Sequence, residues 1–298
     1  MRAIIIVSSA LLAMAIVVAI ALITPQRSAK VFMPDNIINL SPQVSPRPAS
    51  PISPNLPSQA SSPSPTQTPL VSGTTSTKIP KLPGQILDLT NWKLALPINT
   101  AHAGNPDQIT QPELNTFVSA PFFQTADNLD GVVFRANAGG KTTKNSRYPR
   151  SELREMTSNG TREARWSNVK GSHVLEMEAA ITHLPVKKPE VVLAQIHDDK
   201  DDIVMVRLER EHLFVQSQGK NIGDLDNNYK LGTVYKIKIV AEKGRIKVFY
   251  NDVEKANYAK KGSDFYFKAG CYTQSNTSKG DDTNAYGEAV IFSLIIKG

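Results

Sequence analysis

Cysteine is almost absent from this chain of 298 residues, in which Cys271 stands alone. A single cysteine excludes an intramolecular disulfide framework and a zinc site built from several thiolates. The sequence also lacks a glycine-rich phosphate-binding loop and metal ligands at the usual spacings. The acidic run at residues 198–202 could coordinate Ca²⁺, but a solvated acidic turn is the simpler interpretation. We therefore expect no metal and no cofactor.

A general excess of positive charge is missing from most of the chain. The net charge is +7, but residues 1–84 contribute six basic residues and one acid, Asp35. The remaining 214 residues contain 28 basic and 26 acidic residues and are nearly neutral. A nucleic-acid partner is therefore not expected, because any basic patch on the folded part must be local.

Charge is also absent from residues 3–24, a run rich in Ile, Ala, Val and Leu. Such a run is long enough to cross a bilayer as a helix. No clear cleavage site of small residues follows it, so the segment 1–24 is interpreted as a signal-anchor, with a cleaved signal peptide as the alternative. The protein is then expected outside the cytoplasm, extracellular or periplasmic, either secreted or held at the membrane by this segment.

Residues 25–84 contain no aromatic side chain except Phe32, but they hold 13 prolines and 16 serines or threonines. This composition cannot bury enough apolar surface to offset the entropy of the chain. The segment is expected to be a disordered, semi-extended stalk that separates the domain from its anchor.

Long amphipathic helices are missing from residues 85–298, apart from a short candidate at 111–117. Instead, apolar or alternating runs are separated by turn signals such as Ser158-Asn159-Gly160 and Lys243-Gly244. The alternation in 235–241 and 245–250 predicts a β-hairpin. The expected strands are 132–136, 173–181, 191–197, 203–209, 213–217, 234–241, 245–250, 265–272 and 289–296. This pattern predicts one all-β domain, a β-jelly-roll sandwich.

The first candidate site segment is the strand-like run from Arg150 to Glu155. Because side chains alternate along a strand, Arg150, Glu152 and Arg154 share one face. A carboxylate between two guanidinium groups would hold their planes and leave donors free for an anionic ligand. Taken alone, the same pattern also fits a solvated face with neighbouring ion pairs.

The second candidate segment places Gln195 and His197 on one face at the end of an apolar run. An amide donor beside an imidazole suits the stabilisation of an enolate next to a general base. A lone histidine at the end of a strand can equally be an inert hydrogen-bonded residue.

The third candidate segment alternates Lys268, Gly270, Tyr272 and Gln274 on one face with Phe267, Ala269, Cys271 and Thr273 on the other. Cys271 is therefore predicted to be a small core residue and not a nucleophile. Tyr272 beside cationic groups could exchange a proton. The three polar faces together would form a cationic groove with proton-transfer groups, and its expected ligand is an extended polyanion.

Three segments resemble the signature segments of the alginate lyases of polysaccharide lyase family seven. They are the Arg150–Arg154 run (RSELR), the Gln195–His197 run (QIH) and residues 266–274 (YFKAGCYTQ). Residues 92–97 (WKLALP) resemble the opening strand of the family. The resemblance covers residues 85–298 and implies a jelly-roll whose concave sheet binds alginate, a 1,4-linked polymer of mannuronate and guluronate.

The resemblance implies β-elimination, in which the C5 proton and the C4 oxygen leave and an unsaturated uronate remains. Arg150 and Gln195 would neutralise the substrate carboxylate, and Glu152, Arg154 and Gln274 would help to hold the substrate. Lys268 would bind a substrate carboxylate or favour the ionised form of Tyr272. Tyr272 would protonate the leaving oxygen. His197 would take the C5 proton of guluronate, whereas Tyr272 could perform both transfers on mannuronate.

Three positions vary relative to the family. Cys271 stands where the family usually has Val or Ile, and Thr273 replaces the more usual Asn; both lie on the expected core face. Ile196 resembles members that accept guluronate-containing blocks. A monomer is expected. Two alternatives stay open: a non-catalytic polyuronate-binding module, and a lyase for another polyuronate such as glucuronan.

Overall fold

The computed structural model describes residues 81–100, 104–127 and 130–298. The predicted anchor at 1–24 and most of the predicted stalk at 25–84 lie outside these residues. Within the described ranges, no helix is both long enough and apolar enough to span a membrane.

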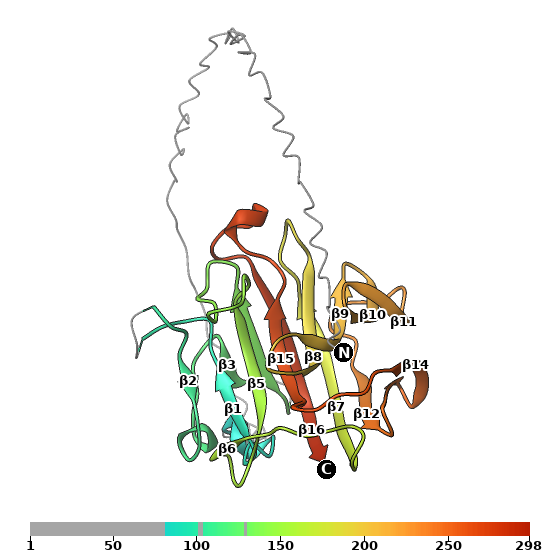
Figure 1. Cartoon of the computed structure of the whole chain (residues 1–298). Helices are drawn as coiled ribbons and strands as arrows, with labels where there is room; N and C mark the ends of the chain where they lie inside the picture. Colours follow the sequence, from blue (N-terminus) through green and yellow to red (C-terminus); the bar gives the residue numbers. More distant parts are fainter. Residues whose placement is uncertain (1–80, 101–103, 128–129) are drawn as a thin grey trace, which may run out of the picture. The chain divides into compact units, whose positions relative to one another are not determined.

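Two antiparallel sheets form the domain. Figure 1 shows neighbouring strands of the first sheet, with β5, β15 and β8 at its centre. The order in this sheet is β11 (Lys220–Asp226), β10 (His212–Ser217), β9 (Asp202–Glu209), β8 (Glu190–His197), β15 (Tyr266–Thr273), β5 (Arg150–Thr157), β1 (Trp92–Ala95) and β2 (Gln108–Ile109), with β6 (Arg162–Glu163) paired to β5.

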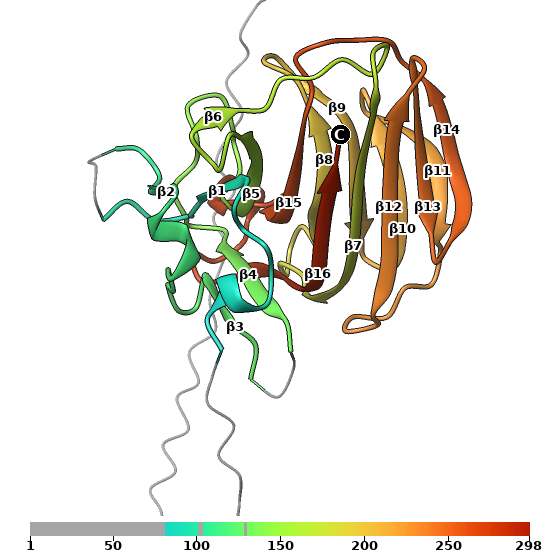
Figure 2. The same ribbon diagram turned by 90° about the horizontal axis from the view of Figure 1, so that it is seen from below.

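The second sheet packs against the first, and Figure 2 shows β16, β7, β12, β13 and β14 side by side as one layer of it. Its order is β14 (Val253–Ala259), β13 (Arg245–Tyr250), β12 (Tyr235–Glu242), β7 (Ser172–His183), β16 (Tyr286–Lys297), β4 (Val132–Asn137) and β3 (Phe123–Thr125). The described helices are single 3₁₀ turns, η1 (Pro83–Gln85), η2 (Glu113–Asn115) and η3 (Thr277–Lys279).

The predicted β-jelly-roll sandwich is confirmed, and the nine predicted strands correspond to β4, β7, β8, β9, β10, β12, β13, β15 and β16. The predicted hairpin is β12–β13, with Glu242 opposite Arg245 at its turn. The expected helix at 111–117 is only the single turn η2. The edge strands β11 and β14 were not predicted, because exposed polar residues interrupt their alternation.

The core fills the space between the two sheets, and period-two alternation decides which side chains enter it. In β5, Ser151 and Leu153 are fully buried and point away from the groove face, on which Arg150 and Glu152 lie. Cys271 and Thr273 of β15 are fully buried as predicted. Burial also raises the pKa of the Cys271 thiol to about 12, which leaves it protonated and unreactive. A buried Leu or Phe in this core contributes about 1.5–3 kcal/mol to stability.

Gly270 lies at a bulge in β15, where the register with β8 shifts between Ala269 and Tyr272. Its φ of +143° is a conformation that residues with a side chain rarely adopt. A Cβ at this position would lie 2.5 Å from the carbonyl oxygen of Ser151 in the neighbouring strand. The bulge therefore depends on glycine, and it directly precedes the predicted catalytic residue Tyr272.

We expect Gly270→Ala to lower the free energy of unfolding by about 3 kcal/mol or more, because backbone strain and a clash with backbone atoms act together. Gly219→Ala is the matched control. Gly219 also has a positive φ, +74°, but no heavy atom lies within 4 Å of its added Cβ, so about 1 kcal/mol is expected there. Chemical denaturation of both variants measures the difference, and equal losses would contradict the clash.

Candidate active site

The register of β15 with its two neighbours brings the three candidate segments together. On one side, three pairs join β15 to β5: Tyr272 with Arg150, Gly270 with Glu152, and Lys268 with Arg154. On the other side, Lys268 lies opposite Gln195 and Tyr266 lies opposite His197 in β8. Segments that are far apart in the sequence thus form one polar surface on the outer face of the first sheet.

This surface forms a groove of about 340 Å³. Seven of the eight predicted site residues line it: Arg150, Glu152, Arg154, Gln195, His197, Lys268 and Tyr272. Gln274 is not among the lining residues. It follows the end of β15, it is 6% exposed, and its carbonyl oxygen accepts a hydrogen bond from Lys188 Nζ at 2.8 Å. The structure therefore brings seven predicted site residues into one groove, and Gln274 lies outside its lining.

Glu152 is the buried centre of the groove floor. Its Oε2 atom lies 2.8 Å from Arg150 Nη1 and 2.5 Å from Lys268 Nζ, and its Oε1 atom accepts a hydrogen bond from the Gln195 amide. Burial alone would raise the pKa of Glu152, but the charges of Lys268 and Arg150 lower it to about 2. Because the folded pKa lies below the ordinary 4.5, this carboxylate stabilises the fold above pH 4.5 and loses that effect as the pH falls towards 2.

Lys268 is buried and forms an ion pair with the buried Glu152. Burial lowers the pKa of its ammonium group to about 8, against the opposing attraction of Glu152. Lys268 is therefore largely charged at neutral pH and loses its charge as the pH rises through about 8. Its ion pair with Glu152 means that Lys268 also orients the carboxylate that holds Arg150 and Gln195.

Arg154 departs from the expected arrangement in which Glu152 pairs with both arginines. Arg154 instead lies 3.3 Å from Glu163 of β6 and stacks its guanidinium 3.9 Å from the centre of the Tyr266 ring. The reason is register, because Arg154 lies opposite Lys93 of β1, and Glu163 accepts from Lys93 Nζ at 2.9 Å as well. The second cation that pairs with Glu152 is therefore Lys268 and not Arg154.

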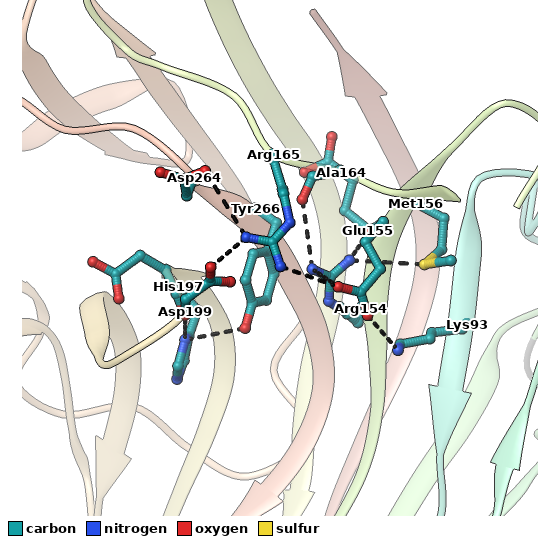
Figure 3. A network of polar contacts seen from close by, with 12 residues as sticks. Lys93, Arg154, Glu155, Met156, Ala164, Arg165, His197, Asp199, Asp264 and Tyr266 are labelled. Carbon is teal, nitrogen blue, oxygen red and sulfur yellow. Dashed lines mark hydrogen bonds and ion pairs between the residues drawn. The ribbon is translucent and has the colours of Figure 1, made fainter. Parts of the chain in front are cut away.

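Figure 3 shows the hydrogen bonds and ion pairs around Arg154, Arg165 and His197. Arg165 connects Glu163, at 3.5 Å, with Asp199 in the loop that follows β8. Asp199 belongs to the acidic run at 198–202, where Asp198 Oδ1 accepts hydrogen bonds from the backbone of Lys200 and Asp201. The run is thus a hydrogen-bonded turn whose residues 199–202 line the groove, and its Asp199 is ion-paired.

His197 is held as a neutral imidazole. Its Nδ1 atom is bonded to the carbonyl oxygen of Asp198, which can only accept, so Nδ1 carries the proton and Nε2 has the free lone pair. The Tyr266 hydroxyl lies 3.2 Å from the same Nδ1 atom. Burial, together with the charge of Lys268, lowers the pKa of His197 below 6.5. Its free lone pair can therefore accept a proton at neutral pH.

Tyr272 lines the same groove as His197 and lies beside Arg150. The guanidinium carbon of Arg150 is 3.8 Å from the centre of the Tyr272 ring, and the phenol oxygen of Tyr272 is 3.0 Å from Ser146 Oγ. A cation over the ring face and a polar partner at the hydroxyl suit a tyrosine that exchanges a proton.

Sequence reasoning missed several residues that line the groove, among them Ser146 and Lys93. Tyr266 belongs to a recognised segment but received no role. Ser146 lies in an irregular connection between β4 and β5, where no periodicity signals which way a side chain points.

A β-sandwich whose groove combines Arg and Lys side chains with a neutral histidine and a tyrosine has the groups that a polysaccharide lyase needs to neutralise a uronate and to transfer its protons. The family model described as alginate lyase matches residues 87–297. The chain belongs to this alginate lyase family.

Individual relatives agree with this assignment. The solved alginate lyase AlgAT5 from Polysaccharide Lyase family 7 is 52% identical, covers 73% of this chain and 98% of its own, and has a TM-score of 0.70. The alginate lyase from Corynebacterium sp. is 43% identical over 72% of this chain and 97% of its own, also at a TM-score of 0.70. A curated alginate lyase of Klebsiella pneumoniae is 26% identical over 71% of this chain and 90% of its own length.

The state of His197 predicts how activity depends on pH. Because burial and the charge of Lys268 hold its pKa below the ordinary 6.5, we expect the fall of kcat/KM on polyguluronate with decreasing pH to be centred below pH 6.5, where the imidazole gains its proton. Initial rates of unsaturated product formation across this range provide the measurement. Polymannuronate is the comparison substrate, and an acid limb on polyguluronate centred at or above pH 6.5 would contradict the prediction.

Proposed function

We propose that this protein is an alginate lyase that cleaves the polymer by β-elimination. The observation that carries the proposal is the shared groove in which Arg150, Gln195, His197 and Tyr272 are all brought together. A module that only binds polyuronate needs the cations but not the two proton-transfer groups, His197 and Tyr272, in the same groove.

The reaction removes the C5 proton and breaks the bond between C4 and the glycosidic oxygen. The electron pair of the C5–H bond forms the C4–C5 double bond, and the leaving oxygen takes a proton, so no water is consumed. The C5 proton becomes acidic only when the neighbouring carboxylate is neutralised. Arg150 and the second amide proton of Gln195, the first being bonded to Glu152, supply this neutralisation.

Two side chains divide the proton transfers. On guluronate, the neutral Nε2 of His197 takes the C5 proton and Tyr272 protonates the leaving oxygen. On mannuronate, where proton and leaving group share a face, Tyr272 performs both steps. A family seven alginate lyase 28% identical to this chain was solved with the substrate GGMG as a variant with one His→Asn and one Tyr→Phe replacement. The residue types replaced there, one histidine and one tyrosine, are the two types proposed here for proton transfer.

The substrate is proposed to include guluronate-containing blocks. Ile196, the middle residue of the Gln195–His197 segment, is the basis for this, together with the neutral base at His197. The protein is proposed to act as a monomer outside the cytoplasm, secreted or anchored by residues 3–24. Membrane fractionation of cells that express the full chain, followed by amino-terminal sequencing, tests whether the segment is retained.

The deciding experiment incubates the full chain separately with polymannuronate, polyguluronate and glucuronan. Ultraviolet absorbance of the new double bond, conjugated to the carboxylate, is recorded. Product from either alginate block supports the proposal. Product from glucuronan alone would keep the mechanism and replace the substrate. Binding without product would leave only the polyuronate-binding module.

A further inference from the structure

Ser146 lies where it can control the hydroxyl group of Tyr272. It belongs to the segment between β4 and β5, it is half-buried, and it lines the groove. Two contacts fix the segment: the Ser146 amide donates to Thr143 O at 2.8 Å, and Asn276 Nδ2 donates to Arg147 O at 2.8 Å. The serine side chain is therefore held over the end of β15.

Four polar groups surround Ser146 Oγ. Arg150 Nη2 donates to it at 3.0 Å and the Tyr148 amide donates to it at 3.2 Å. The Tyr148 carbonyl oxygen and Tyr272 Oη both lie 3.0 Å away. Among the described residues, Ser146 is the one hydrogen-bond partner that the structure gives to the Tyr272 hydroxyl.

The balance of donors and acceptors decides the direction of the bond to Tyr272. A serine hydroxyl has one proton to donate and two lone pairs to accept with. Arg150 and the Tyr148 amide together occupy both lone pairs. Ser146 can therefore act towards Tyr272 as a donor, by turning its proton from the Tyr148 carbonyl to the phenol oxygen.

We propose that Ser146 is a positioning residue that donates a hydrogen bond to Tyr272 Oη and so directs the proton of Tyr272 into the groove. This inference rests on the proposed function of Tyr272. When Tyr272 is a phenol, its lone pair faces Ser146 and its own proton faces the leaving oxygen. When Tyr272 has lost that proton, the same bond from Ser146 stabilises the phenolate that accepts the C5 proton of mannuronate. Ser146 keeps its own proton throughout and is not a relay.

Arg150 has a second role in this arrangement, in addition to neutralising the substrate carboxylate. Its Nη1 atom is bonded to Glu152 while its Nη2 atom is bonded to Ser146, so one guanidinium orients both the carboxylate centre and the serine. The chain of contacts from Glu152 through Arg150 to Ser146 and Tyr272 therefore joins substrate neutralisation to proton transfer.

The test compares Ser146→Ala and Ser146→Thr in the full chain. Alanine removes the donor, and we expect kcat on polymannuronate to fall about 10- to 100-fold, as for the loss of a hydrogen bond to a charged group. KM should change by no more than about twofold, because the substrate contacts remain. Threonine keeps the hydroxyl and should retain kcat within about threefold.

Ser167→Ala is the matched control. Ser167 Oγ also donates to a backbone carbonyl, Gly262 O at 3.0 Å, and accepts from the amide two residues on, Val169 N at 3.3 Å. It lines no part of the groove. Both alanine variants should lose similar thermal stability, but only Ser146→Ala should lose kcat.

The comparison of substrates separates positioning from general damage. The loss in Ser146→Ala should be larger on polymannuronate, where Tyr272 transfers two protons, than on polyguluronate, where it transfers one. Unchanged kcat, a rise in KM alone, equal losses on both substrates, or equal losses in the alanine and threonine variants would each overturn the inference. Failure of the wild-type chain to form unsaturated product would overturn the proposed function instead.

Discussion

Tyr272→Phe is expected to lower kcat by about a thousandfold or more on both alginate blocks, because it removes the hydroxyl proposed to protonate the leaving oxygen. The ring remains, so the contact with the Arg150 guanidinium at 3.8 Å should persist. Binding of oligosaccharide should therefore be nearly unchanged. Initial rates of unsaturated product formation, with calorimetric binding of a short oligouronate, measure the two effects separately.

The control for Tyr272→Phe is the loss of a tyrosine hydroxyl outside the groove, which should leave the rate unchanged. Tyr258→Phe removes a phenol hydroxyl from β14 in the second sheet, and its rate should equal that of the wild type. Turnover by Tyr272→Phe within tenfold of the wild type would show that another residue supplies the proton.

His197→Ala is expected to act selectively. On polyguluronate it should lower kcat by about 100- to 1000-fold, since the base that faces the C5 proton is removed. On polymannuronate the loss should stay within about fivefold, because Tyr272 performs both transfers there. The ratio of the two losses is the informative quantity, because a general disturbance of the groove lowers both rates alike.

His183→Ala is the corresponding control in the second sheet, where His183 stacks on Tyr286. It should change the melting temperature but not the ratio of the two rates. Equal losses by His197→Ala on both substrates would show that the roles of the two proton-transfer residues are divided differently.

Period-two alternation predicted the groove residues that lie within β5 and β15, but it failed for Gln274, which follows the end of β15. Arg150, Glu152 and Arg154 alternate with buried residues of β5, and Lys268 and Tyr272 alternate with Phe267 and Cys271 of β15. These predictions hold because a buried face constrains every second residue of a strand.

The partners of each charge could not be predicted in this way. Glu152 pairs with Arg150 as expected, but its second cation is Lys268 from another strand, while Arg154 turns to Glu163. Such choices depend on the register between strands that are distant in sequence. Ser146 could not be assigned either, since its role follows from four contacts within one irregular connection.

The order of strands in the first sheet also bears on how the protein acquires its activity after synthesis. The central pairing joins Arg150 in β5 to Tyr272 in β15, and the chain between them includes most of the second sheet. Closing so long a loop is slow and is among the later events in the folding of a β-protein. A chain in which only the local β12–β13 hairpin has formed therefore still lacks a catalytic centre. Renatured chains should regain turnover only with the final cooperative step.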